Sequence, residues 1–278
     1  MRKTIFILSL IFISMISNAQ IKKGNPTQLK NFNNSTTYFV KDDRYPMYNE
    51  AIIKYAQDFW KITPFKIVYR NDIDTLILSK TNSFIIPSEV TIVLEGKKQN
   101  YIYINTLLGG KPKLNGLPDI GSFPLADIED DEESYNFKVP LFLQLIQYHI
   151  ATSINNPEID YFELIKLYNK NKKKLEQMEL WLLETDLDEE INSIDKVKKT
   201  YSNNVKVVTK EEMAKAIIEK KQGIAVVHNV YPKNYSDGNE CWKMIISTSD
   251  GEILYLLNRT INKSNNPKIN NKDLKRFN

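Results

Sequence analysis

The chain has 278 residues, of which 42% are apolar, and its 38 Lys and Arg residues nearly balance its 34 Asp and Glu residues. A formal net charge of +4 leaves no basic footprint for a nucleic acid, so we expect no nucleic-acid partner. The single cysteine, Cys241, excludes an intrachain disulfide, and a chain of this length can bury a sufficient core without one.

The first nineteen residues have the order of a cleavable secretory signal peptide. Arg2 and Lys3 precede an apolar run over 5–16, and small residues follow, ending at Ala19. That run spans about 18 Å as a helix, too short for a hydrocarbon core of about 30 Å. We therefore expect cleavage near Ala19 and a periplasmic or extracellular protein with no permanent membrane span. An uncleaved, membrane-dipping N-terminus is the alternative. Gln20 stands where a lipoprotein needs a cysteine.

A first α/β module is predicted over 37–108, after a polar, Asn-rich and flexible lead-in over 20–36. Apolar runs and helical periodicity predict its elements. In chain order these are a strand at 37–40, a helix at 46–60, a strand at 65–68, a short helix at 72–78, a strand at 83–86 that ends at Pro87, and a hairpin over 91–104.

The segment 109–179 is predicted to be an irregular, acidic loop followed by connecting helices. Gly and Pro recur through 109–136, and the acidic run 127–133 lies near its end. The helix predicted over 141–150 is apolar on nearly every face, which is typical of a helix inside a protein. A second, charged helix is predicted over 158–177.

A second α/β module is predicted over 180–262, followed by a C-terminal tail over 263–278. Its elements are strands at 180–183, 205–208 and 224–227, helices at 188–201 and 213–220, and a hairpin over 243–257 around Asp250-Gly251. Both modules thus follow the order β-α-β-α-β-β, which predicts an internal pseudo-repeat with little sequence identity. The fold class is α/β (α+β), with two small mixed-sheet modules joined by helices.

His228 and Cys241 are the candidate catalytic pair. His228 follows one predicted strand, and Cys241 precedes the next, so pairing of the strands could bring them together. A thiolate activated by an imidazole is the minimum for cysteine nucleophilic catalysis, and Asp237 or Glu240 could orient the ring. The alternative is a free, packed cysteine. The other histidine, His149, lies in the apolar helix and is expected to be a hydrogen-bonded core residue.

Metal ligands stay unassigned, and we infer no cofactor. His228, Asp237, Glu240 and Cys241 are potential zinc ligands, although their spacing matches no short zinc motif. The acidic run 127–133 is a potential calcium ligand set, but it lacks the alternating acidic residues and the Gly of a helix–loop–helix calcium loop. Such a run is also typical of a solvated face.

Three segments resemble a group of uncharacterised exported proteins of the Bacteroidota. They are Ser17-Asn18-Ala19-Gln20, FWKITPFKIV at 59–68, and CWKMIISTSDGEILYLL at 241–257. The resemblance implies export and carries no activity or site residue. The strand–helix–strand–helix plan is also similar, in topology alone, to the amino-terminal domain of periplasmic Tol-system proteins.

The sequence therefore favours an exported, envelope-associated protein with a non-catalytic role in binding or interaction. The junction between two small sheets is a natural place for a groove, and the partner is an envelope protein or a ligand that the sequence does not identify. A secreted or periplasmic hydrolase that uses Cys241 and His228 is the alternative.

Overall fold

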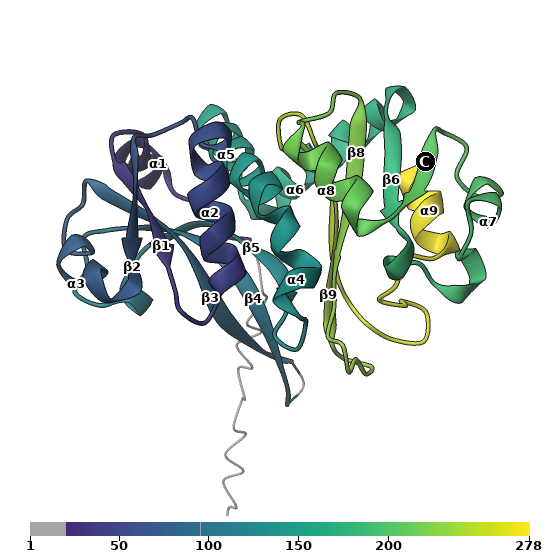
Figure 1. Ribbon diagram of the computed structural model, residues 1–278, viewed down its shortest axis with the longest axis horizontal. Helices are drawn as coiled ribbons and strands as arrows, with labels where there is room; N and C mark the ends of the chain where they lie inside the picture. Colours follow the sequence, from purple (N-terminus) through teal and green to yellow (C-terminus); the bar gives the residue numbers. More distant parts are fainter. Residues whose placement is uncertain (1–20, 95) are drawn as a thin grey trace, which may run out of the picture.

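Two five-stranded mixed sheets lie side by side with helices packed between them (Figure 1). The computed structural model describes residues 21–94 and 96–278, so the predicted signal peptide lies outside the described residues. The two mixed sheets with their helices confirm the predicted fold class of two small α+β modules.

The first sheet combines three parallel strands with two antiparallel ones. Its order is β2 (Phe65–Tyr69), β1 (Thr36–Lys41), β3 (Asn82–Leu94), β4 (Lys97–Leu108) and β5 (Asp119–Asp127). Strand β1 pairs in parallel with both β2 and β3, whereas β3–β4 and β4–β5 are antiparallel.

The second sheet repeats this arrangement strand by strand. Its order is β7 (Val205–Val208), β6 (Glu179–Leu183), β8 (Ile224–Val230), β9 (Glu240–Ser247) and β10 (Ile253–Thr260). Strand β6 pairs in parallel with β7 and β8, and the two remaining pairs are antiparallel. Strands β1 to β5 therefore correspond to β6 to β10, which agrees with the predicted pseudo-repeat.

The repeat differs from the prediction in which hairpins correspond. The hairpin of β4 and β5 corresponds to the hairpin of β9 and β10. The sequence had instead predicted that the hairpin over 91–104, which is formed by β3 and β4, corresponds to the one over 243–257. The cause is β5, which lies inside the stretch expected to be irregular. This strand contains Gly121 and Pro124. A sheet tolerates both residues here because β5 is its edge strand.

Strand β3 is longer than predicted because it continues through Pro87. Its pairing with β1 ends at Ile85, so no β1 residue needs an N–H from Pro87. On its other side β3 pairs with β4 as far as Leu94, and Gly96 forms the turn at a φ of 78°.

The α-helices cover both faces of each sheet and fill the space between the sheets. They are α1 (Pro26–Asn33), α2 (Pro46–Phe59), α3 (Ile73–Leu76), α4 (Glu132–Tyr135), α5 (Val139–Asn155), α6 (Tyr161–Lys170), α7 (Ile194–Lys198), α8 (Lys210–Ile218) and α9 (Asn271–Phe277). Short 3₁₀ turns extend several of them, so the helix predicted over 188–201 is in fact a 3₁₀ turn followed by α7.

The segment expected to be a flexible lead-in is folded onto the first module from Ile21 onward. A capping box begins α1, because the side chain of Asn25 accepts a hydrogen bond from the Gln28 N–H and the Gln28 side chain accepts one from the Asn25 N–H. Phe32 is fully buried, and its ring contacts Trp60 edge to face. The prediction of a flexible lead-in was wrong because a few buried apolar residues hold this otherwise polar segment against the core.

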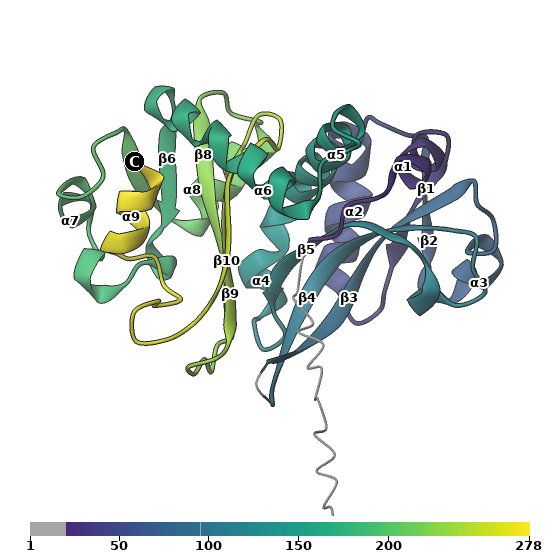
Figure 2. The ribbon, with the colours of Figure 1, turned by 180° about the vertical axis from the view of Figure 1, so that it is seen from behind.

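Helix α5 lies at the centre of the molecule, as its apolar sequence predicted. It packs on α1, α2 and β5 of the first module and on α8 and β10 of the second (Figure 1). Gly251, in the β9–β10 turn, has a φ of 73°, and a Cβ there would lie 2.3 Å from the Gln144 backbone. This turn thus needs glycine for both its conformation and its approach to α5. Figure 2 shows α6 beside β10 on the same side of the molecule.

Residues 263–278 were expected to be a tail, but they end in α9, whose Leu274 and Phe277 are buried under the second sheet. Over the part of the chain that the structure describes, we find no helix whose length and apolar character would suit it to crossing a membrane.

Candidate functional site

The structure does not bring His228 and Cys241 together. His228 on β8 pairs with Met244 on β9, so their side chains share one face of the sheet. Cys241 lies three residues from Met244 along the same strand and therefore faces the other side. The predicted dyad does not form for this reason: Cys241 lies three positions from the residue that pairs with His228 and on the opposite face of the sheet.

Each member of the predicted site has another environment. His228 Nε2 donates to the Pro124 carbonyl at 3.0 Å, and its ring contacts Phe142 edge to face. Burial raises the pKa of the Cys241 thiol, which opposes thiolate formation. Asp237 is exposed in the loop before β9, where its carbonyl accepts a hydrogen bond from Lys97, and it does not orient the His228 ring.

His149 is the hydrogen-bonded core residue that the sequence predicted. Its Nδ1 lies 2.8 Å from the Tyr168 hydroxyl, and its Nε2 lies 3.0 Å from the Lys22 carbonyl oxygen. Desolvation in the core lowers its pKa to about 4, so the ring is neutral near pH 7.

The acidic run 127–133 holds the two modules together. Asp127 Oδ2 accepts the Lys233 N–H at 2.8 Å, and Glu129 Oε2 accepts a hydrogen bond from Asn234 Nδ2 at 2.6 Å. Asp127 Oδ1 also accepts the Glu129 N–H. Within residues 21–94 and 96–278, no cluster of three or more His, Cys, Asp or Glu side chains is arranged to hold a metal ion.

A polar pocket of about 310 Å³ lies between the modules, and we call it the junction pocket. Strand β6 ends at Leu183 and places Thr185 and Asp186 in its wall, while the end of β8 contributes Asn229. The chain runs from β6 to β7 on one side of β6, and then crosses back to β8 on the other side. The pocket lies at the carboxyl ends of the parallel strands β6 and β8, where this direction of connection changes. Ligands in open α/β sheets commonly bind at this position.

The first module closes the other side of the junction pocket. The lining residues from this module follow or belong to β5, α4 and the turn before α5: Leu125, Ala126, Asp130, Ser134, Tyr135 and Lys138. The second module adds the loop after β8 and one residue near the C-terminus: Tyr231, Lys233, Tyr235 and Lys268. The pocket therefore exists only when both modules are packed together.

Lys138 is the most unusual residue in this pocket. Its side chain is 6% exposed, and its ammonium forms no hydrogen bond and no ion pair within 4.0 Å among the described residues. The Phe137 ring centroid lies 5.5 Å away. Burial lowers the pKa of Lys138, and the charges of Asp186 and Asp130 oppose that shift.

Two acceptors in the same pocket also lack partners. The Oδ2 atom of Asp186 is buried without a hydrogen bond, and burial raises the pKa of this carboxyl. Asn229 donates through Nδ2 to the Pro267 carbonyl at 3.1 Å, which fixes the amide and leaves its buried Oδ1 without a partner. One cavity is thus lined by a buried lysine without an ion pair to any described residue, and by a carboxylate oxygen and an amide oxygen that are buried without a hydrogen bond.

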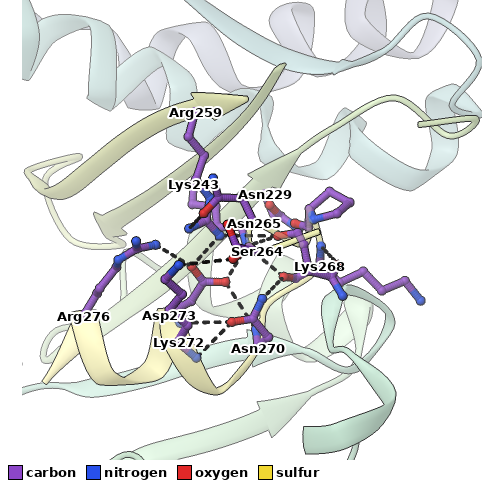
Figure 3. A network of polar contacts seen from close by, with 12 residues as sticks. Asn229, Lys243, Arg259, Ser264, Asn265, Lys268, Asn270, Lys272, Asp273 and Arg276 are labelled. Atoms are coloured by element: carbon purple, nitrogen blue, oxygen red, sulfur yellow. Dashed lines mark hydrogen bonds and ion pairs between the residues drawn. The ribbon is translucent and has the colours of Figure 1, made fainter. Parts of the chain in front are cut away.

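A buried ionic network fixes the wall that Lys268 and Pro267 provide. Figure 3 shows Lys243, Arg259 and Arg276 directed at the carboxylate of Asp273 on α9. Lys243 Nζ also donates to the Lys268 carbonyl at 2.8 Å. The C-terminal helix therefore acts through this network to hold the 266–270 segment against the pocket.

A larger pocket of about 480 Å³ lies near the amino-terminal ends of β6 and β7, beside α8. Two ion pairs between exposed side chains line it, Lys206 with Glu212 at 2.6 Å and Lys215 with Glu219 at 3.9 Å. Such exposed pairs need no ligand, so the junction pocket is the better candidate site.

Little in the sequence indicates this site. Lys138 is one of 38 basic residues, and its only local signal is its position directly before the apolar helix that begins with Val139. Asp186 and Asn229 follow predicted strands, but the sequence does not show that their strands are neighbours. In comparisons with known proteins, no family model, curated protein or solved structure matches this chain.

Proposed function

We propose that this protein is exported to the cell envelope and binds a small polar ligand in the junction pocket. One observation carries the proposal: Asp186 Oδ2 and Asn229 Oδ1 are buried without a hydrogen-bond partner in the same cavity. The buried Lys138 lines that cavity too, and among the described residues its ammonium has no hydrogen bond or ion pair. An unsatisfied buried polar atom costs about 1–3 kcal/mol. The two in this cavity are accounted for if a ligand supplies the missing partners, and the same ligand would pair with Lys138.

The lining of the pocket favours binding over hydrolysis. Neither His228 nor Cys241 lines it, and the groups that do line it are suited to holding charge and accepting hydrogen bonds. The tyrosines Tyr135, Tyr231 and Tyr235 add ring surface, which is typical of small-molecule sites.

A thermal-shift screen of the purified mature protein tests the proposal. The library contains amino acids, sugars, nucleosides and small organic acids, each measured against the wild-type protein and the Lys138→Met variant. We expect one class of compound to raise the Tm of the wild type and not that of Lys138→Met. Lys113→Met is the matched control, because Lys113 is exposed and lies outside the pocket. The proposal fails if no compound raises the wild-type Tm, or if Lys138→Met responds equally.

Export has its own test. Expression of the full chain with a periplasmic fractionation, followed by N-terminal sequencing, should recover a mature protein that begins at Gln20 or carries its cyclised form. Recovery of the intact chain beginning at Met1 in the cytoplasm would contradict export.

A further inference from the structure

We infer that the ligand of the junction pocket is an α-amino acid, bound as a zwitterion with its carboxylate at Lys138 and its ammonium group at Asp186 and Asn229. The inference rests on the proposed function and specifies its ligand class. The observation behind it is the juxtaposition, in one cavity, of the ammonium of the buried Lys138, which has no ion pair within the described part of the chain, with two buried acceptor atoms that have no donor.

The donor and acceptor inventory selects this class. Lys138 offers up to three donors and no acceptor, whereas Asp186 Oδ2 and Asn229 Oδ1 offer only acceptor sites. A ligand that is only an anion satisfies Lys138 and leaves the Asp186 carboxylate without a donor. A ligand that is only a cation does the reverse. A zwitterion supplies a carboxylate to the lysine and N–H donors to both acceptors.

The spacing of charges in the pocket agrees with a compact zwitterion. Lys138 and Asp186 are close enough for each to influence the ionisation of the other, yet they form no ion pair within 4.0 Å. An α-amino acid carries its two charged groups on one carbon atom, so both can reach neighbouring partners.

The other charged groups around the pocket have different surroundings. Asp130 Oδ2 already accepts the Asp127 N–H at 3.1 Å, and the exposed Lys233 directs its Nζ at the Glu129 carbonyl at 3.4 Å. Lys268 is half-buried at the wall, and it would add a favourable charge for the ligand carboxylate.

The remaining surface of the pocket favours an apolar or aromatic ligand side chain. Tyr231 and Tyr235 meet edge to face with centroids 5.9 Å apart, and Tyr135 and Leu183 line the same cavity. Tyr235 is 44% exposed, which places an aromatic ring at the solvent side of the pocket for a ligand to cover. A cavity of about 310 Å³ has room for a single large amino acid.

Isothermal titration calorimetry with matched ligands tests the inference on the wild-type protein. The twenty L-amino acids are titrated first. The best ligand is then compared with its deaminated acid and its decarboxylated amine; for phenylalanine these are 3-phenylpropanoate and 2-phenylethylamine. We expect each analogue to bind at least tenfold more weakly than the amino acid, because each leaves one charged group of the pocket without its partner.

Two variants then identify which pocket residue binds each charged group of the ligand. In Lys138→Met, the amino acid and its decarboxylated amine should bind equally weakly, because the carboxylate has lost its partner. In Asp186→Asn, the amino acid and its deaminated acid should differ by less than in the wild type. Circular dichroism and Tm check that both variants fold. If one does not fold, the analogue series on the wild type decides the question alone.

The outcomes separate this inference from the proposed function. If a compound from another class binds the wild type and not Lys138→Met, the pocket is a ligand site but the amino-acid assignment is wrong. Equal affinity for an amino acid and an analogue that lacks one charge also overturns the assignment. If no small compound binds in any assay, the proposed function fails and the inference fails with it.

Discussion

Lys243 Nζ donates a hydrogen bond to Asp273 Oδ2 across 2.5 Å, and both side chains are completely buried. The pair joins β9, inside the second sheet, to α9 at the end of the chain (Figure 3). Burial lowers the pKa of Lys243, and the charge and hydrogen bond of Asp273 oppose that shift. The ion pair thereby anchors the segment that carries Lys268 to the wall of the junction pocket.

Removing one partner of this pair should be costly. In Asp273→Asn, Lys243 and Arg259 lose the carboxylate that neutralises them, and we expect the free energy of unfolding to fall by about 3–5 kcal/mol. Urea denaturation measures the change, with Lys275→Ala on the exposed side of α9 as the control. A loss below about 1 kcal/mol in Asp273→Asn would contradict an essential anchor.

The charges of the junction pocket should behave in the opposite way, because they serve a ligand instead of the fold. Replacing Lys138 and Asp186 together, as Lys138→Met with Asp186→Asn, removes two charges that have no direct partner. We expect the unliganded protein to gain about 1–2 kcal/mol in unfolding free energy and to lose ligand binding. A loss of more than 1 kcal/mol in urea denaturation would indicate a structural role.

Acid should destabilise the protein through His149. Its folded-state pKa of about 4 lies below the ordinary value of 6.5, so the unfolded state binds more protons between these pH values. Stability is therefore highest above pH 6.5 and falls as the pH drops toward 4. We expect the His149 contribution to decrease by about 2 kcal/mol between pH 7.5 and pH 5.

The measurement compares urea denaturation of the wild type and His149→Gln at both pH values. His228, whose pKa burial also lowers, is present in both proteins and cancels in the comparison. An identical pH dependence in the two proteins would show that His149 does not contribute in this way.

Cys241 should be unreactive in the folded protein. It is fully buried, and burial raises the pKa of its thiol, so the thiolate is both rare and inaccessible. We expect no reaction with a thiol reagent such as Ellman's reagent under native conditions, and one equivalent of reaction after denaturation. Rapid labelling of the native protein would contradict the buried placement.

The N-terminal segment before β1 should contribute to stability. Phe32 is fully buried in the main core, whereas its neighbour Asn33 is exposed. We expect Phe32→Ala to cost about 3–5 kcal/mol and Asn33→Ala less than about 0.5 kcal/mol. Equal, small effects in thermal or urea unfolding would restore the prediction of a flexible lead-in.

Local patterns in the sequence determined most elements of the fold. Short runs rich in apolar residues located β1, β2, β6 and β7, and the helices predicted over 46–60 and 213–220 correspond to α2 and α8. These predictions succeed because hydrogen bonding and side-chain periodicity act over a few residues. Strand β5 was missed because Gly121 and Pro124 are unfavourable in a strand except at an edge or a bulge, and the edge position depends on the whole sheet.

The site itself was decided only by the tertiary structure. In the sequence, His228 and Cys241 are separated by a short loop and suggested a catalytic pair, but the register opposite Met244 placed them on different faces. Lys138 and Asp186 are far apart in the sequence and carry no local signal, yet the packing of the two modules buries them in one cavity. Burial without a partner is a property of that packing, because whether a charge is desolvated depends on what surrounds it in space.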